Sequence, residues 1–141
     1  MWIYKGKKIR SHEDLLPGCT DIVYEITFTD GRKYVGKKTV AAKRRKKSTK
    51  KQLAQRKNYA RIEWTKLPFL KYQGSSELTA GLKVATKEIL YQTKGKTTAT
   101  YLEVALLIHY AALFDDMYIN KNISGKFFDN ALDGLLEENN G

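Results

Sequence analysis

The sequence predicts a small α+β domain, in which strands near the middle of the chain are surrounded by helices. Residues 22–29 and 32–36 are rich in β-branched and aromatic residues and flank Asp30-Gly31, which favours a β-hairpin with a two-residue turn. Residues 100–114 form the longest apolar stretch, which is too long for a strand and predicts a central buried helix. With 141 residues, the chain has about the length of one domain.

Weaker patterns outline the two ends of the domain. Residues 1–20 are expected to form an N-terminal extension, with a hairpin around Lys5-Gly6-Lys7 and a short helix opened by a capping box at 11–14. Residues 129–141 are expected to be a polar C-terminal tail.

The segments between the hairpin and the long helix are expected to be mainly helical. Residues 37–58 contain 11 Lys or Arg in 22 positions, so this stretch is expected to be helical or mobile and outside the core. Residues 59–72 are expected to pack in the helix layer, and 78–85 have the apolar spacing of a short helix. Residues 88–91 predict a third strand.

The charge of the chain points to a polyanionic partner. The sequence has 26 Lys and Arg against 15 Asp and Glu, a net charge of +11. Residues 1–98 carry +16 of this and residues 99–141 carry −5. Since positive patches attract nucleic acid, DNA or RNA is expected to meet the first two thirds of the chain.

Other features exclude several classes of protein. No apolar run approaches the roughly 18 residues that a membrane span needs, so a soluble globular domain is expected. The N-terminus lacks the apolar core of a signal peptide. The lone Cys19 cannot form an internal disulfide or a cysteine metal cluster, so a reducing cytoplasm is the expected setting.

Two tyrosines, Tyr24 and Tyr34, lie on opposite strands of the predicted hairpin. If their side chains share a face they meet, and one interpretation is simple cross-strand packing. The other interpretation is a phosphate site, because Gly36 ends the second strand and is followed directly by Lys37 and Lys38. A glycine there allows close approach of a phosphate backbone.

Glu103 stands out in the long apolar stretch. It is the only acidic residue between Glu88 and Asp115. A carboxylate in an apolar helix is costly unless it faces solvent, a partner or a metal ion. Glu103 is therefore either on a narrow exposed stripe or part of a site.

The basic segment offers residues that bind phosphates on either side of a cleaved bond without reading bases. The alternative is a solvated lysine-rich face. The candidate nucleic-acid contacts in and before this segment are Gly36, Lys37, Lys38, Lys43, Arg45, Lys46, Lys47, Lys50 and Lys51.

The order of these features resembles the GIY-YIG nuclease family, and in particular its phage-encoded members. The similarity runs in steps of ten residues from Ile22-Val23-Tyr24 to Tyr34-Val35-Gly36 and on to Arg44. It covers roughly residues 1–128, with further similar blocks at 6–9 with 13–15, 64–76, 101–103 and 118–120. Ile22 stands where the first motif commonly has glycine and Val35 replaces isoleucine, so Tyr24 itself carries the first motif.

The resemblance implies a three-stranded antiparallel sheet flanked by helices, and it implies roles for single residues. Tyr24 and Tyr34 orient or deprotonate the attacking water. Arg44, on the first helix, neutralises charge on the scissile phosphate, with Arg45 as its rival. Glu103 binds a single Mg²⁺ or Mn²⁺ ion, and Asn120 supports the site.

Tyr72 is the nearest candidate for the histidine or further tyrosine that some members of the family place beside the base, and it is also a candidate nucleic-acid contact. His12 and His109 are expected to be a surface residue and a core or helix-face residue. A tyrosine acts as a base only if its pKa, about 10 in water, is lowered. Plausible sources of that effect are the cations Lys37, Lys38 and Arg44. We expect both motif phenols, the guanidinium and the carboxylate to converge on one phosphate-sized cleft.

The implied function is metal-dependent hydrolysis of DNA by a phage or mobile-element endonuclease, a group that includes homing enzymes. Such an enzyme is expected in the cytoplasm, that of the host if phage-encoded, as a monomer or weak homodimer with no membrane or small-molecule substrate. One alternative is a nucleic-acid-binding module that keeps the fold without cutting. Another is a basic ribosome-associated protein.

Overall fold

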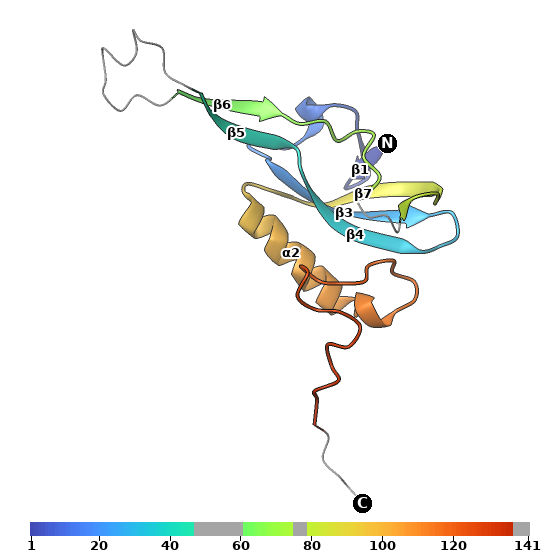
Figure 1. The fold of residues 1–141 in the computed structure, drawn as a ribbon. Coiled ribbons are helices and arrows are strands. Elements are labelled where there is room, and N and C mark those ends of the chain that lie inside the picture. Colours follow the sequence, from blue (N-terminus) through green and yellow to red (C-terminus); the bar gives the residue numbers. More distant parts are fainter. Residues whose placement is uncertain (47–60, 75–78, 137–141) are drawn as a thin grey trace, which may run out of the picture.

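A computed structural model describes residues 1–46, 61–74 and 79–136, with the side chains of 43–46 and 61–63 left aside (Figure 1). The elements in chain order are β1 (Trp2–Tyr4), β2 (Lys7–Ile9), the 3₁₀ helix η1 (His12–Asp14), β3 (Asp21–Phe28), β4 (Lys33–Thr39), β5 (Ala41–Lys46), β6 (Arg61–Lys66), β7 (Val84–Thr93), α2 (Lys96–His109) and the 3₁₀ helix η3 (Ala112–Phe114).

Five strands form one mixed sheet in the order β2-β1-β7-β3-β4, so the expected three-stranded antiparallel sheet is wrong in size and type. The expected three strands are present as the antiparallel unit β7-β3-β4. The difference lies at the N-terminus, where β1 pairs in parallel with β7 and carries β2 with it. Residues 2–4 and 7–9 are thus part of the sheet.

The two hairpins of this sheet follow from local turn chemistry. Between β1 and β2, Lys5 and Gly6 both have positive φ, at 47° and 80°, as the favoured two-residue hairpin turn requires. Between β3 and β4 the loop is one residue longer than expected. The Phe28 amide donates to the Arg32 carbonyl, and Gly31, at φ 91°, donates back to the Phe28 carbonyl.

The two faces of the sheet bury different clusters. Side chains alternate between the two faces of the sheet along β3 and β4. The register of the two strands places Tyr24, Ile26 and Tyr34 on the same face. We call it the tyrosine face; its core is made with residues outside the hairpin, namely Trp2, Ile9, Leu15, Val40, Phe69, Ile89 and Ile119. The opposite face, which we call the helix face, packs Val35 against Leu107 of α2.

Helix α2 is shorter and less buried than the sequence predicts. It begins at Lys96, four residues before the expected start, and ends at His109. Ala111 then takes a left-handed conformation at φ 50°, and η3 continues as a separate turn. Only Ala99 and Leu107 of α2 are buried, because the helix lies on one face of the sheet rather than between two layers (Figure 1).

Residues expected to be helical form a two-stranded antiparallel ribbon instead. Strand β4 extends to Thr39, and β5 then pairs with β6 from Ala41↔Lys66 to Lys46↔Arg61. The expectations of helix within 37–58 and 59–72 are therefore wrong for 37–46 and 61–66. Within the described part of 78–85, only Thr79 is helical and it is 3₁₀, because Gly81 has φ 77° and β7 begins at Val84.

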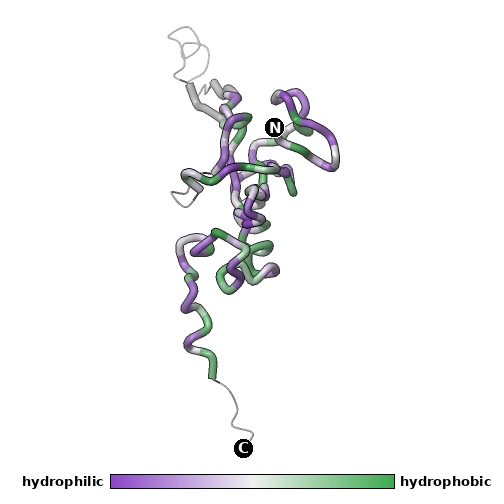
Figure 2. Tube along the Cα trace, turned by 90° about the vertical axis from the view of Figure 1, so that its right-hand side faces the viewer, coloured by the Kyte–Doolittle hydropathy of each residue, from purple (hydrophilic) through white to green (hydrophobic). Residues whose placement is uncertain are grey.

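The ribbon and the C-terminal segment leave the body in opposite directions (Figures 1 and 2). Before it departs, the C-terminal segment covers the outer edge of β4, where the Lys33 amide donates to the Met117 carbonyl and Ile119 donates to the Lys33 carbonyl. Residues 129–136 are exposed. Among the described residues, no helix is long and apolar enough to cross a bilayer.

Trp2 is a suitable test of how the N-terminus joins the core. Its indole is fully buried and donates to the Phe69 carbonyl at 2.9 Å. We expect Trp2→Phe to lower the free energy of unfolding by about 1–3 kcal/mol, because the buried carbonyl loses its donor. The matched change Trp64→Phe, at a tryptophan that is 57% exposed, should cost under about 0.5 kcal/mol. Urea unfolding measures both, and equal midpoints would contradict the expectation.

Candidate nuclease site

The centre of the candidate site is Tyr24, whose ring is 1% exposed. Three aromatic rings surround it, with centroids at 5.2 Å for Trp2, 5.8 Å for Tyr72 and 6.4 Å for Tyr34. Its hydroxyl donates to the Tyr72 hydroxyl at 3.4 Å. The two motif tyrosines and Tyr72 therefore form one cluster on the tyrosine face.

Gly36 makes room for this cluster. It pairs with Tyr24 across the hairpin. A Cβ at position 36 would lie 2.5 Å from the Tyr24 hydroxyl oxygen, 2.7 Å from its Cζ and 3.1 Å from Tyr34 Cε1. The glycine is thus required by the phenol that lies across it, a reason different from the close phosphate approach expected from the sequence.

Tyr72 is held in place through its backbone by a buried lysine. The Lys87 ammonium, on a residue only 4% exposed, donates to the carbonyls of Leu70 at 2.7 Å and Tyr72 at 3.1 Å. It also lies 4.7 Å from the centroid of the Trp2 ring. Burial lowers the pKa of Lys87, and the two carbonyls and the ring face compensate part of that cost. Lys87 therefore fixes the 70–72 segment against the tyrosine face.

The solvent side of the cluster carries a cation. The Lys38 ammonium lies 4.7 Å from the centroid of the Tyr72 ring. Tyr34 and Tyr72 are both half-buried, whereas Tyr24 is enclosed. A ligand that approaches from this side therefore meets Lys38, Tyr72 and Tyr34 before it meets Tyr24.

Asn120 fixes the backbone between the second motif tyrosine and the glycine. Its side-chain oxygen accepts from the Val35 amide at 3.0 Å, and its side-chain nitrogen donates to the Val35 carbonyl at 2.7 Å. Asn120 thus continues the edge pairing that residues 117–119 begin. It acts as a positioning residue, because both polar groups of its amide are used on the backbone of Val35.

Glu103 lies on α2, which packs against the helix face of the sheet. Lys37 lies between Gly36 and Lys38 in β4, so its side chain is on the face opposite to theirs. It reaches α2 and donates to the Thr100 hydroxyl at 2.6 Å. The charge of Lys37 also acts on Glu103, one turn further along α2. The carboxylate still lies close enough to Tyr24 to raise the pKa of that phenol. The electrostatic effect of Glu103 therefore reaches from α2 to the phenol cluster.

The environment of Glu103 fits a weakly held hard cation. Burial raises the pKa of its half-buried carboxyl, and Lys37 opposes that shift. Within the described residues Glu103 makes no hydrogen bond or ion pair. No group of three or more His, Cys, Asp or Glu forms a metal cluster among them. A single carboxylate suits Mg²⁺ or Mn²⁺, which keep waters and take substrate phosphate as ligands.

The expectation that cations lower the pKa of the motif phenols is wrong for Tyr24. Burial raises its pKa well above the usual value, and Tyr72, Tyr34 and Glu103 add to the shift in that order. Lys37 lies on the other face and Lys38 lies over Tyr72, so neither offsets burial. Tyr24 is therefore a hydrogen-bond donor and a poor base.

Arg44 and most of the candidate lysines lie either in the ribbon or outside the described residues. Arg44 lies in β5, opposite Glu63, so its expected place on a first helix is wrong. The choice between Arg44 and Arg45 lies outside the described side chains, as do the contacts of Lys43 and Lys46. Lys47, Lys50 and Lys51 lie outside the described residues altogether. The structure thus places the backbone of Arg44 in the ribbon, while its guanidinium lies outside the described side chains.

Lys87 and Thr100 are the positioning residues that the sequence did not reveal. The signal for Lys87 was a lysine at an inward position in the alternation of a strand, two residues before Ile89. Thr100 gave no signal, because its partner Lys37 is 63 residues away in the sequence. The two histidines are not at this site: His12 is half-buried against the base of the ribbon, and His109 is exposed at the end of α2.

Comparison with known families matches residues 2–123 to a family model described as "Putative endonuclease segE, GIY-YIG domain". The match contains β1 to η3 and every residue of the cluster around Gly36. Searches of curated proteins and of solved structures gave no match.

The two hydrogen bonds between the Asn120 side chain and the backbone of Val35, which we call the edge clamp, can be tested by mutation. We expect Asn120→Ala to lower the free energy of unfolding by about 1–3 kcal/mol, because two hydrogen bonds to Val35 are lost. The Val35 amide should also exchange with solvent faster. Urea unfolding and hydrogen exchange measure these effects, with the exposed Asn130→Ala as the matched control. Unchanged protection of Val35 in Asn120→Ala would show that the clamp is not needed.

Proposed function

Because the chain belongs to the GIY-YIG endonuclease family, we propose that it is a metal-dependent endonuclease that hydrolyses phosphodiester bonds in DNA. The observation that supports this most directly is the cluster of Tyr24, Tyr34 and Tyr72 packed beside Gly36, with the charge of the Glu103 carboxylate on α2 acting on Tyr24. A phenol cluster on one side and a carboxylate on the other leave the edge of β4 as the place for a phosphate. The positive charge of the ribbon supports a nucleic acid as the substrate, since β5 and β6 carry six Lys or Arg against one Glu.

Hydrolysis requires that a water oxygen bonds to phosphorus while the bond to the leaving oxygen breaks. The products are a phosphate monoester and a free hydroxyl. The water gives up one proton, the leaving oxygen gains one, and negative charge spreads over the phosphoryl oxygens in the transition state. Hydrogen-bond donors and cations that face those oxygens therefore accelerate the reaction.

The phenols divide into a buried donor and two half-buried groups. Tyr24 stays protonated and holds the Tyr72 hydroxyl through their hydrogen bond. Tyr34 and Tyr72 are the phenols that reach toward solvent, so they orient the attacking water or a phosphate oxygen. Lys38, over the Tyr72 ring, adds positive charge on the same side.

Glu103 would hold Mg²⁺ or Mn²⁺ together with waters and the substrate phosphate. A bound divalent ion supplies Lewis-acid stabilisation of the phosphoryl oxygens. Lys37 holds the neighbouring turn of α2 through Thr100 and favours the ionised carboxylate that a metal requires. The phage or mobile-element type, the cytoplasmic setting and the monomer or weak homodimer remain part of the proposal, supported by the similarity of the sequence blocks.

The decisive test is cleavage of supercoiled plasmid at low salt. With Mg²⁺ or Mn²⁺ the wild-type chain should produce open-circular or linear DNA, and EDTA should stop it. Glu103→Gln keeps the size of the side chain but removes its charge, so cleavage should fall by at least about 100-fold while DNA binding changes little. Glu88→Gln, an exposed carboxylate on β7, is the matched control and should cleave normally.

Tight binding without cleavage under these conditions would replace the enzyme by a nucleic-acid-binding module on the same fold. Cleavage by Glu103→Gln at the wild-type rate would retain the enzyme and remove Glu103 as its metal ligand. Tight RNA binding with no dependence on metal would instead favour a ribosome-associated protein.

The pH dependence of kcat gives a second, independent test. Only the ionised carboxylate binds metal, and burial raises the pKa of Glu103 above the usual 4.5. Cleavage at saturating DNA should therefore rise with pH, with a midpoint above 4.5. Lys37→Met removes the charge that lowers this pKa, so the midpoint should move to higher pH. Initial rates across a pH series at constant Mg²⁺ measure the shift.

Lys33→Met is the control for that series. Lys33 lies on the same strand and face as Lys37, but its ammonium is 3.4 Å from Glu25 instead of acting on Glu103. Its midpoint should equal that of the wild type. If both lysine variants shift the midpoint equally, the effect comes from general loss of charge rather than from the Lys37–Glu103 pair.

A further inference from the structure

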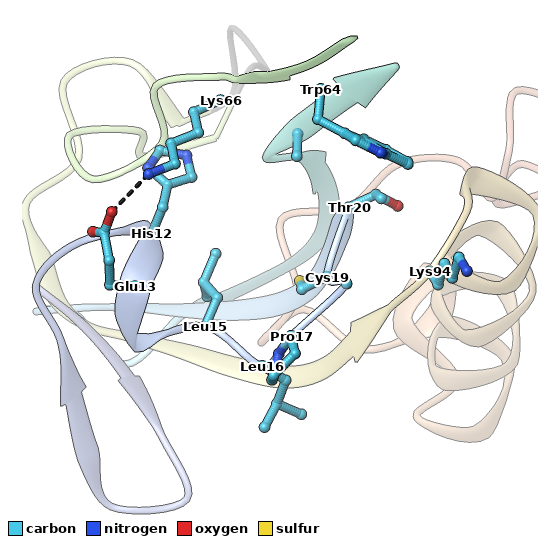
Figure 3. A pocket seen from close by; sticks show the side chains of 12 residues that line it. His12, Glu13, Leu15, Leu16, Pro17, Cys19, Thr20, Trp64, Lys66 and Lys94 are labelled. Atoms are coloured by element: carbon cyan, nitrogen blue, oxygen red, sulfur yellow. Dashed lines mark hydrogen bonds and ion pairs between the residues drawn. The ribbon is translucent and has the colours of Figure 1, made fainter. Parts of the chain in front are cut away.

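A second hollow lies away from the tyrosine cluster, between the N-terminal segment and the base of the ribbon (Figure 3). Its volume is about 630 Å³, within the range of pockets that hold small organic ligands. Trp64 of β6 and Lys94 stand on one side of it, and His12, Glu13 and Lys66 stand on the other (Figure 3).

Trp64 is the most unusual residue of this pocket. Trp64 is 57% exposed, and it lies in a ribbon whose other residues include many cations. Indole is the largest apolar side-chain ring, and leaving it in water forgoes the stabilisation that burial gives. In contrast to Trp2, which is fully buried and hydrogen-bonded, Trp64 contributes little to the core.

The rest of the pocket combines an apolar floor with a positive rim. Leu15, Pro17 and Cys19 lie along its base (Figure 3). Glu13 is neutralised by Lys66 at 2.6 Å, and that pairing lowers the pKa of Glu13 to about 2. Lys94 makes no ion pair within the part of the chain that the structure describes. The charge left for a ligand is therefore positive.

The walls of the pocket are fixed relative to one another. One nitrogen of His12, Nε2, lies 2.8 Å from the Leu67 carbonyl and 3.1 Å from the Val40 carbonyl. Since both partners are acceptors, this nitrogen carries a proton and donates to them. The Leu67 amide in turn donates to the Val40 carbonyl, which closes the base of the ribbon. The platform that carries Trp64 is thus bound to η1.

From these features we propose that the pocket binds an unpaired nucleobase of DNA, stacked on the Trp64 ring with its adjacent phosphate near Lys94. A base has apolar faces for the indole and the floor, and it is attached to an anion that suits the rim. A strand that lies along the basic ribbon passes Trp64. The inference rests on the proposed function for the identity of the polymer, but it does not require cleavage.

The fluorescence of Trp64 reports the stacking directly. The probe is a short single-stranded DNA, added to the Glu103→Gln protein in EDTA so that no cleavage occurs. An oligonucleotide of equal length made of abasic sites keeps the phosphates and lacks the bases. The base-containing strand should quench the emission, the abasic strand should bind with little quenching, and Trp64→Phe, which leaves only Trp2, should show no quenching.

Affinity gives the second measurement. Stacking of one base on an aromatic ring contributes roughly 1–3 kcal/mol, so Trp64→Ala should weaken single-strand binding by about 5- to 150-fold. Trp64→Phe should lose less, because it keeps a ring. Phe114→Ala, at an aromatic residue that is 52% exposed in the acidic C-terminal third, is the matched control and should bind normally. An intact duplex of the same sequence then distinguishes two cases. Quenching by the duplex shows that the pocket takes a base extruded from paired DNA. Quenching by the single strand alone shows that the pocket takes only a base that is already unpaired.

The proposal is overturned if the abasic strand quenches as strongly as the base-containing strand, or if Trp64→Ala binds as tightly as Phe114→Ala. Its failure is separable from failure of the proposed function. Plasmid cleavage without Trp64 quenching removes only the base pocket. Quenching without plasmid cleavage keeps the base pocket and removes only the nuclease.

Discussion

The structure depends on one steric constraint, the passage of the Tyr24 ring across Gly36 of the neighbouring strand. Any side chain at position 36 meets the phenol at 2.5–2.7 Å, so the hairpin closes in this form only with glycine there. The constraint places the Tyr24 hydroxyl beside Gly36 and within reach of Tyr72, while the ring stays in the core. A polar group is thereby held in a fixed position inside the core.

Three clamps hold the surroundings of that hydroxyl, and each uses a side chain from a different part of the chain. Asn120 holds the backbone of Val35, and Lys87 holds the 70–72 segment that carries Tyr72. Lys37 ties β4 to α2 through Thr100. The phenols and α2 lie on opposite faces of the sheet, and the charge of Glu103 still acts on Tyr24. The C-terminal segment pairs with the outer edge of β4 at Lys33 and Val35, so the part of that edge proposed for a phosphate begins at Gly36.

Electrostatic environment separates the residues that sequence motifs group together. Tyr24 and Tyr34 occupy equivalent places in two motifs, yet Tyr24 is enclosed and burial raises its pKa, while Tyr34 remains half-buried. Glu103 and Glu13 are both carboxylates beside lysines. The pKa of Glu103 is raised because burial outweighs Lys37, and that of the exposed Glu13 is lowered because its hydrogen bond to Lys66 prevails. Sequence identifies the groups, and their surroundings assign the chemistry.

The sequence by itself determined the β3–β4 hairpin, the place of the long helix, the short capped helix at 12–14 and the family, because these rest on local turn chemistry, periodicity and motif spacing. The tertiary structure alone decided the parallel pairing of β1 with β7, the ribbon in place of a basic helix, and the face to which Glu103 belongs. These features join segments that are distant in the chain or override local propensity, and the free energy that selects them comes from packing and strand pairing that no short window contains.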